Sequence, residues 1–147
     1  MSITVGSILE RKGSDAFTVT PQALVADAVR VLGDHDIGVV VVSRTGDDVA
    51  GIVSERDIVR RLAVDGPSCL QQAVAEIMTT PVTTCRRDQT TAELMTVMTT
   101  ERIRHVPVVE DDRMVGLVSI RDAVESYVRE LEVTTGALED YVSGSSY

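Results

Sequence analysis

The chain is poor in aromatic side chains: its 147 residues include one Phe, three Tyr and no Trp. Proteins that bind single-stranded nucleic acid stack its bases on aromatic rings, and this composition offers no such platform. Basic charge is also scarce, because 14 Lys and Arg residues stand against 23 Asp and Glu residues, giving a net charge of −9. That surplus opposes contact with a phosphate backbone, so we expect no nucleic-acid partner.

Cysteines, long apolar runs and catalytic motifs are equally scarce. Cys69 and Cys85 have neither a CxxC pair nor a His cluster beside them, which argues against a metal site and a disulfide framework. No apolar run approaches the roughly 18 residues of a membrane span, and the N-terminus lacks a signal-peptide pattern, so we expect a cytoplasmic protein without membrane contact. The chain contains no GxGxxG and no Gly-x4-Gly-Lys-Ser/Thr loop, and we expect no enzymatic activity and no required cofactor.

What the chain does contain is a repeat. Residues 51–57 read GIVSERD and residues 116–122 read GLVSIRD, 65 positions apart. The upstream segments also align, at offsets of 66 to 69: 37–42 with 103–108, 25–29 with 91–95, and 5–9 with 74–78. Two copies are too few for a solenoid, and each half would be marginal alone, so we expect two halves packed into one pseudo-symmetric module.

Each copy has hydrophobic spacing typical of the order β-α-β-β-α, which predicts an α/β (α+β) fold. The strands are expected at 16–19, 39–43, 49–54, 82–85, 104–109 and 114–119, and the helices at 25–32, 55–64, 91–98 and 120–132. Thr90 and Glu93 predict a capping box. The expected boundaries are 5–66 for the first repeat, 67–133 for the second with a linking helix at about 71–78, and 134–147 for a C-terminal tail with a frayed end.

Two interpretations apply to Ser54-x-x-Asp57 and Ser119-x-x-Asp122, which lie where a strand passes into a helix. In the first, Ser and Asp cap the helix; Asp is shorter than the usual Glu or Gln, so we expect its carboxylate to be freer to point outward. In the second, the helix N-terminus attracts a phosphate, the adjacent Arg adds a planar fork, and the carboxylate accepts hydrogen bonds from a ribose diol. Capping requires neither the Arg nor the Gly that both copies keep, which favours the ligand.

The doubled motif, the string RIRHVPV at 102–108 and the β-α-β-β-α order resemble a tandem pair of cystathionine-β-synthase (CBS) domains over residues 5–133. The resemblance is to stand-alone proteins that hold one CBS pair. It implies a regulatory, non-catalytic module that binds AMP, ADP, ATP or NAD, and in some members S-adenosylmethionine, between the repeats. It also implies a homodimer that modulates an effector protein of unknown identity.

The resemblance assigns residues to two sites. In one, Asp122 holds the ribose diol, with further contacts expected from Ser119, Arg121, Arg104, Phe17, Thr18, Ile37 and Val39. In the other, Asp57 takes that role, with further contacts expected from Ser54, Arg56, Thr83, Thr84, Ile103 and His105. Where the second copy has residues 104–107, RHVP, the first has 38–41, GVVV, so we expect two clefts of unequal affinity or of different nucleotide preference.

Several alternatives stay open. The module could instead be a constitutive interaction scaffold with vestigial clefts. His105 is either a ligand contact or a half-exposed structural residue, and His35 is interpreted as a charge at a helix C-terminus. For the homodimer, the second helices of the two repeats are expected to meet across a two-fold axis through Ile58, Leu62, Ala123, Val124, Tyr127, Val128 and Leu131.

Overall fold

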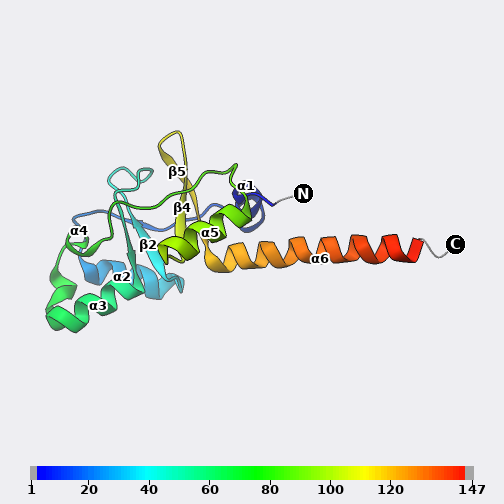
Figure 1. Cartoon of the computed structure of the whole chain (residues 1–147). Helices are drawn as coiled ribbons and strands as arrows, with labels where there is room; N and C mark the ends of the chain where they lie inside the picture. Colours follow the sequence, from blue (N-terminus) through cyan, green and yellow to red (C-terminus); the bar gives the residue numbers. More distant parts are fainter. Residues whose placement is uncertain (1–2, 145–147) are drawn as a thin grey trace.

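A computed structural model describes residues 3–144 of the chain. The elements of the first repeat and the junction are α1 Val5–Lys12, β1 Thr18–Val19, α2 Val25–His35, β2 Val39–Val42, β3 Gly51–Ser54, α3 Glu55–Asp65, the 3-10 helix η1 Gly66–Gln71 and α4 Val74–Ile77 (Figure 1). Those of the second repeat are α5 Thr91–Glu101, β4 His105–Glu110, β5 Arg113–Ser119 and α6 Ile120–Gly144. The predicted mixed α/β fold of two similar units is confirmed.

The first repeat forms a three-stranded sheet with β2 in the middle. Strand β2 runs parallel to β1 and antiparallel to β3, with Val40 opposite Val53. All four residues of β2 are buried, as expected for a β-branched run with both faces covered. The strand begins beside the start of α3, because Val39 lies opposite Ser54 and the Glu55 N–H donates to Gly38 O at 3.0 Å.

The second repeat has only two strands, and the strand expected at 82–85 is wrong. Cys85 alone bridges to β4, where its N–H donates to Pro107 O at 3.0 Å and its carbonyl accepts from Val109 N–H at 2.9 Å. To extend the pairing toward residue 83, the N–H of residue 107 would have to donate the next hydrogen bond, and proline lacks this N–H. In the first repeat the equivalent residue, Val41, does donate, to Phe17 O at 3.1 Å.

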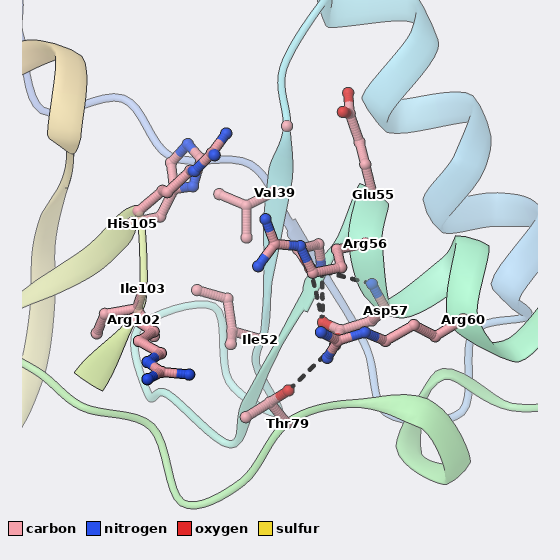
Figure 2. Close-up of a pocket in the computed structure, with 13 residues that line it drawn as sticks. Val39, Ile52, Glu55, Arg56, Asp57, Arg60, Thr79, Arg102, Ile103 and His105 are labelled. Atoms are coloured by element: carbon pink, nitrogen blue, oxygen red, sulfur yellow. Dashed lines mark hydrogen bonds between the residues drawn. The ribbon is translucent and has the colours of Figure 1, made fainter. Parts of the chain in front are cut away.

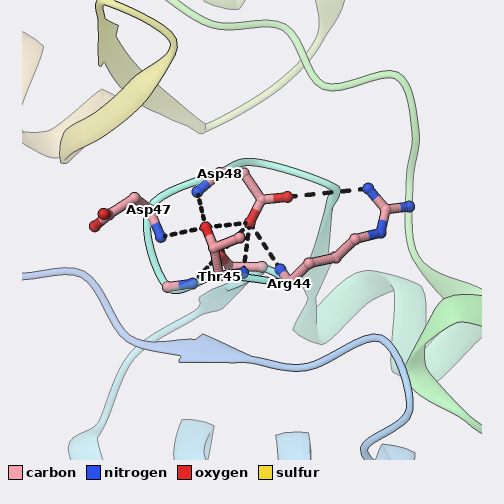
Figure 3. A network of polar contacts seen from close by, with 6 residues as sticks. Arg44, Thr45, Asp47 and Asp48 are labelled. Carbon is pink, nitrogen blue, oxygen red and sulfur yellow. Dashed lines mark hydrogen bonds and ion pairs between the residues drawn. The ribbon is translucent and has the colours of Figure 1, made fainter.

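The turn between β2 and β3 is closed by Asp48 (Figure 3). Its Oδ1 accepts hydrogen bonds from Ser43 Oγ at 2.7 Å and from the amides of Arg44 and Thr45 at 2.8 and 2.9 Å, and these bonds lower the pKa of Asp48. The neighbouring Asp47 carbonyl accepts from the Met114 N–H of β5 at 2.7 Å. The turn therefore ties the first repeat to the second.

The linking helix expected at about 71–78 is wrong in form. The chain instead makes η1, which has a proline in its first turn, and then the single helical turn α4. Residues 72 and 73 between them are extended, because Gln72 O accepts from Val25 N–H at 2.9 Å and Ala23 O accepts from Val74 N–H at 2.7 Å. Pairing with the chain before α2 therefore interrupts the helix.

The two hydrophobic cores exchange their first helices. Helix α1, for which we predicted no helix, packs in the core of the second repeat, where Val5 and Ile8 are fully buried. Helix α4 packs in the core of the first repeat through Val74 and Ile77. Neither core follows the sequence boundary between the repeats, so the two repeats are interlocked in one module.

This exchange explains the Gly of the repeated motif. A Cβ on Gly116 would lie 2.7 Å from Leu9 Cδ2 of α1, and one on Gly51 would lie 2.8 Å from Met78 Cγ beside α4. Such approaches are too close for carbon atoms, so a side chain at either position would force the side chain of Leu9 or Met78 to move. The Gly that had favoured a ligand is thus required by packing.

Helix α6 does not end near residue 132, as expected, but continues to Gly144 and projects from the body of the molecule (Figure 1). The helical spacing of Leu138, Tyr141 and Val142 continues the pattern of the preceding turns, and Gly136 does not break the helix. Of the tail end expected to fray, Ser145–Tyr147 lie outside the described residues. Within residues 3–144, no helix combines the length and apolar character that a bilayer crossing requires.

Candidate functional site: two clefts between the repeats

The two Ser-x-x-Asp motifs form capping boxes at the starts of α3 and α6. Asp57 Oδ2 accepts the Ser54 N–H at 2.8 Å, and Ser54 Oγ accepts the Asp57 N–H at 3.2 Å. Asp122 and Ser119 make the same two bonds at 2.8 and 3.2 Å. The expectation that Asp would be freer to point outward is wrong, since each carboxylate reaches back to the cap amide. Each box uses Oδ2 and leaves Oδ1 outside it.

Each capping box opens onto a pocket between the repeats. The Asp57 cleft has a volume of about 350 Å³ (Figure 2) and is lined by Gly38, Val39, Ile52, Ser54, Glu55, Arg56, Asp57, Arg60, Thr79, Arg102, Ile103, Arg104 and His105. The Asp122 cleft, of about 420 Å³, is lined by Lys12, Asp15, Ala16, Phe17, Asp36, Ile37, Gly38, Val39, Arg104, His105, Leu117, Ser119, Ile120, Arg121 and Asp122. Each cleft thus has walls from both repeats.

Most of the residues selected from the sequence come together in these clefts. Of the set expected with Asp122, only Thr18 is absent from the lining; it lies in β1, whose backbone pairs with β2. Of the set expected with Asp57, Thr83 and Thr84 are absent. Thr83 and Thr84 directly precede Cys85, the one residue of the segment 82–85 that bridges to β4, so they belong to the segment that does not form the expected strand.

Sequence reasoning missed Thr79, which donates a long hydrogen bond of 3.4 Å to Asp57 Oδ1. A backbone bridge positions it: the Ile52 N–H donates to Thr79 O at 3.1 Å, and the Thr79 N–H donates to Ile52 O at 2.8 Å. This pairing joins β3 to a segment 27 residues later, at no spacing that a local pattern reveals. No sequence signal pointed to Thr79.

Sequence reasoning also missed Lys12. Its Nζ donates to Asp122 Oδ2 at 2.7 Å and to Leu117 O at 2.8 Å. Burial by itself would raise the pKa of Asp122, but the hydrogen bonds from Lys12 and Ser119 outweigh it and lower that pKa. The available signal was composition, because Lys12 is the one lysine among fourteen basic residues. Its position follows from the exchange of α1 into the second repeat.

His105 lies at the divide between the clefts and lines both. Its Cε1 is 3.5 Å from the point where a Cβ on Gly38 would lie, which is an ordinary van der Waals distance, so the imidazole packs beside the backbone of Gly38. Burial lowers the pKa of His105 although Asp122 and Glu55 act in the opposite direction, so the ring is neutral at pH 7. A neutral imidazole can donate one hydrogen bond and accept another at this divide.

Phe17 and His35 stack face to face, with ring centroids 3.8 Å apart and planes inclined by 19°. Beyond the helix-end role expected from the sequence, His35 therefore covers one face of the Phe17 ring. The Phe17 side chain keeps 37% of its surface exposed and lines the Asp122 cleft. It is the one Phe, Tyr or Trp among the residues lining the two clefts within residues 3–144.

Comparison with known proteins identifies the family. The CBS domain model matches residues 5–64 and 74–129, and the chain therefore belongs to the CBS-domain family. The mitochondrial CBS domain-containing protein CBSX3 of Arabidopsis thaliana is 34% identical over 151 residues, covering 97% of this chain and 73% of the relative.

Solved structures agree with this assignment. The CBS-domain protein ATU1752 of Agrobacterium tumefaciens is 42% identical, covers 86% of this chain and 95% of its own, and has a TM-score of 0.82. The CBS domain pair of MJ0100, solved with 5′-methylthioadenosine and S-adenosylmethionine, is 25% identical, covers 88% of this chain and 99% of its own, and has a TM-score of 0.78. The resemblance to a CBS pair is confirmed.

Proposed function

We propose that this chain is a regulatory module that binds adenosine-containing ligands, AMP, ADP, ATP or NAD among them, in its two clefts. The observation that carries the proposal is the pair of equivalent carboxylates, Asp57 and Asp122, each with Oδ1 left outside its capping box. A carboxylate oxygen beside a helix N-terminus can accept a ribose hydroxyl while the helix end attracts a phosphate. The MJ0100 pair supports the class of ligand, because both of its bound molecules contain adenosine.

The proposed action is regulation through the packing of the repeats. A ligand in the Asp122 cleft would contact Ile37 of the first repeat and Ser119 of the second at once, since both line that cleft. It would therefore favour the relative placement of the repeats that fits it, and so bias a dimer or an effector protein. We propose that the chain binds without catalysing, so ATP or NAD incubated with it should stay intact.

A thermal-shift titration tests this function. Protein that has been unfolded, stripped of ligand and refolded would be titrated with AMP, ADP, ATP, NAD and S-adenosylmethionine. A ligand at about 100 times its dissociation constant adds roughly 2.7 kcal/mol per site to the free energy of unfolding. The double variant Asp57→Ala with Asp122→Ala should lose the shift, and an unchanged affinity in that variant would refute the assignment.

A matched control separates binding from capping. Glu93 holds the same position in the capping box of α5 and lines neither cleft. Glu93→Ala should lower stability to an extent similar to one Asp variant, since each removes one box, but leave the ligand shift intact. Loss of the shift in Glu93→Ala would mean that the Asp variants act through folding alone.

A constitutive scaffold remains the second candidate, and one observation favours it: both carboxylates already have structural hydrogen bonds, and that of Asp122 also pairs with Lys12. A scaffold would show no ligand shift and would form a stable complex with an effector protein.

We propose that the protein is located in the cytoplasm, whereas the Arabidopsis relative is named mitochondrial. Imaging of the tagged protein in its own cells would distinguish the two compartments.

We propose a homodimer formed through the exposed face of α6. Two of the residues expected at the interface are wrong for it, because Ile58 and Ala123 are buried in their own cores; Leu62 packs against the first core. The other four expected residues, Val124, Tyr127, Val128 and Leu131, stay exposed. Two further exposed residues, Leu138 and Tyr141, continue their heptad pattern down the helix. Apolar residues at such spacing are typical of helices that pair along a seam.

The length and charge of α6 fit a second copy of the same helix. Its 25 residues span about 37 Å, and the acidic residues Glu125, Glu132 and Glu139 lie one position after each Val124, Leu131 and Leu138, on the side away from the seam. Leu131→Glu with Leu138→Glu should convert the dimer to a monomer in sedimentation at tens of micromolar, on the order of assay concentrations. The control Glu132→Ala with Glu139→Ala should remain dimeric; a monomeric wild type would refute the interface.

A further inference from the structure

We infer that the two clefts select adenosine ligands by a difference in charge: the Asp57 cleft takes nucleoside polyphosphates, and the Asp122 cleft takes an adenosine compound with at most one phosphate. This inference rests on the proposed function. Its basis is a set of pseudo-equivalent positions at which the charge is inverted between the clefts.

The first inverted pair caps the first helix of each repeat. Asp36 ends α2 and Arg102 ends α5, and both adopt the left-handed conformation, with φ of 51° and 56°. They are 66 residues apart, the same offset that aligns Ile37 with Ile103. Asp36 lines the Asp122 cleft and Arg102 lines the Asp57 cleft. The same place in the fold therefore presents an anion to one cleft and a cation to the other.

The second inverted pair lies one turn into α3 and α6. Arg60 of α3 lines the Asp57 cleft, whereas the residue 65 positions later, Glu125 of α6, is not among the residues that line the Asp122 cleft. Arg121 forms an ion pair with this Glu125 at 3.9 Å, so its charge is partly matched. The equivalent Arg56 has Arg60 in place of a partner, and among residues 3–144 no carboxylate forms an ion pair with either.

The third difference concerns the carboxylates themselves. Lys12 already neutralises Asp122 at 2.7 Å, whereas Asp57 receives only neutral donors, from its own box and from Thr79. Figure 2 shows Arg56 and Arg60 on one side of the Asp57 cleft and Arg102 on the other, while the carboxylate of Glu55 points away from them. Arg56, Arg60 and Arg102, none of which forms an ion pair with a carboxylate of residues 3–144, thus surround the space beside Asp57.

The charges of the lining residues differ accordingly. Four Arg residues and two carboxylates give the Asp57 cleft a formal charge of +2. Lys12, Arg104 and Arg121 against three Asp residues give the Asp122 cleft a charge of zero. Guanidinium forks bind phosphate oxygens through paired, charge-assisted hydrogen bonds. A chain of two or three phosphates therefore gains contacts in the Asp57 cleft and meets Asp15 and Asp36 in the other.

The test is isothermal titration with adenosine, AMP, ADP and ATP. Asp122→Ala leaves the Asp57 cleft intact, and Asp57→Ala leaves the Asp122 cleft intact. In Asp122→Ala, affinity should rise from adenosine to ATP, with ATP at least about tenfold tighter than AMP, the worth of roughly one charge-assisted hydrogen bond. In Asp57→Ala, affinity should fall from AMP to ATP.

A charge exchange makes the test specific. Arg60→Glu with Arg102→Asp, placed in the Asp122→Ala background, gives positions 60 and 102 the residue types of Glu125 and Asp36, lowers the formal charge of the Asp57 cleft from +2 to −2 and should abolish the preference for ATP. The matched control is Arg30→Glu with Arg129→Glu, which changes the net charge equally at exposed positions outside both clefts and should keep that preference.

The outcomes separate this inference from the proposed function. Binding of adenosine compounds with equal affinity for AMP and ATP in the Asp57 cleft would overturn the inference and leave the proposed function standing. Loss of the preference in the exposed-arginine control, as complete as in the exchange variant, would also overturn the inference alone. No binding of any of the four compounds to folded wild-type protein would overturn both.

Discussion

Replacing Gly116 by Ala should destabilise the module by forcing α1 off the second repeat. The new Cβ would lie 2.7 and 2.9 Å from the two terminal carbons of Leu9, whereas carbon atoms in contact normally lie about 3.5–4.0 Å apart. Leu9 cannot rotate away, since its side chain is 3% exposed within the core that contains Val106 and Val118. Overpacking of this kind costs about 1–3 kcal/mol.

The expected change in melting temperature follows from that free energy. In a chain of this length, 1 kcal/mol shifts Tm by about 2–4 °C, so Gly116→Ala should melt roughly 2–12 °C lower in a thermal scan followed by circular dichroism. Gly33→Ala is the control, because a Cβ there meets no atom within 4 Å and Ala favours the helix by about 0.5–1 kcal/mol. If Gly116→Ala were as stable as Gly33→Ala, the exchange of α1 would be refuted.

A second substitution identifies the contact itself. Leu9→Ala alone should cost about 2–5 kcal/mol, because it leaves a cavity beside β5. In the double variant the Ala at 116 would fill part of that cavity. The double variant should therefore lose less stability than the sum of the two single losses, by about 1 kcal/mol or more. Strict additivity would mean that Gly116 and Leu9 do not touch.

Three single groups give further predictions. Lys12→Met should raise the pKa of Asp122 toward its usual value of 3.8. Because a lowered pKa stabilises the folded protein fully only above the usual value, the variant should be about 1 kcal/mol less stable in urea near pH 7. The difference in stability should vanish in acid, as the pH falls through the lowered pKa of the wild type. Thr90→Ala removes an N-cap bond of 3.1 Å to the Glu93 amide and should cost about 1 kcal/mol by the same assay, without altering ligand affinity. Burial raises the pKa of the Cys85 thiol to about 12, so a thiol reagent at pH 8 should label it only after the protein is unfolded; rapid labelling of the native protein would contradict its burial.

The sequence was a good guide to the parts that depend on local pattern. The doubled GxVSxRD string, with its apolar spacing on either side, predicted the family, the repeated order of elements and the places where β3 meets α3 and β5 meets α6. Thr90 and Glu93 form the predicted capping box. These features could be predicted because strand alternation, helix periodicity and capping involve residues only a few positions apart.

It was a poor guide where one residue changes a long-range pairing. Pro107 cannot donate the bond that Val41 donates in the first repeat, so the segment at 82–85 makes a bridge at Cys85 in place of a strand. The Asp side chains of both motifs close their capping boxes, although the sequence suggested that their carboxylates are freer to point outward. The first outcome depends on which residue pairs with the distant segment, and the second on the backbone geometry at the helix start; a local pattern specifies neither.

By itself, then, the sequence determined that two homologous halves each present an acidic helix start, and its alignment already contains the pairs Asp36–Arg102 and Arg60–Glu125. Only the tertiary structure decided what these residues face. The exchange of α1 brings Lys12 to Asp122, and the fold places Arg56, Arg60 and Arg102 around Asp57 without an ion pair to any carboxylate of the described residues 3–144. The reason is physical: contacts across more than a hundred residues depend on how two cores pack together, and no local periodicity records that choice.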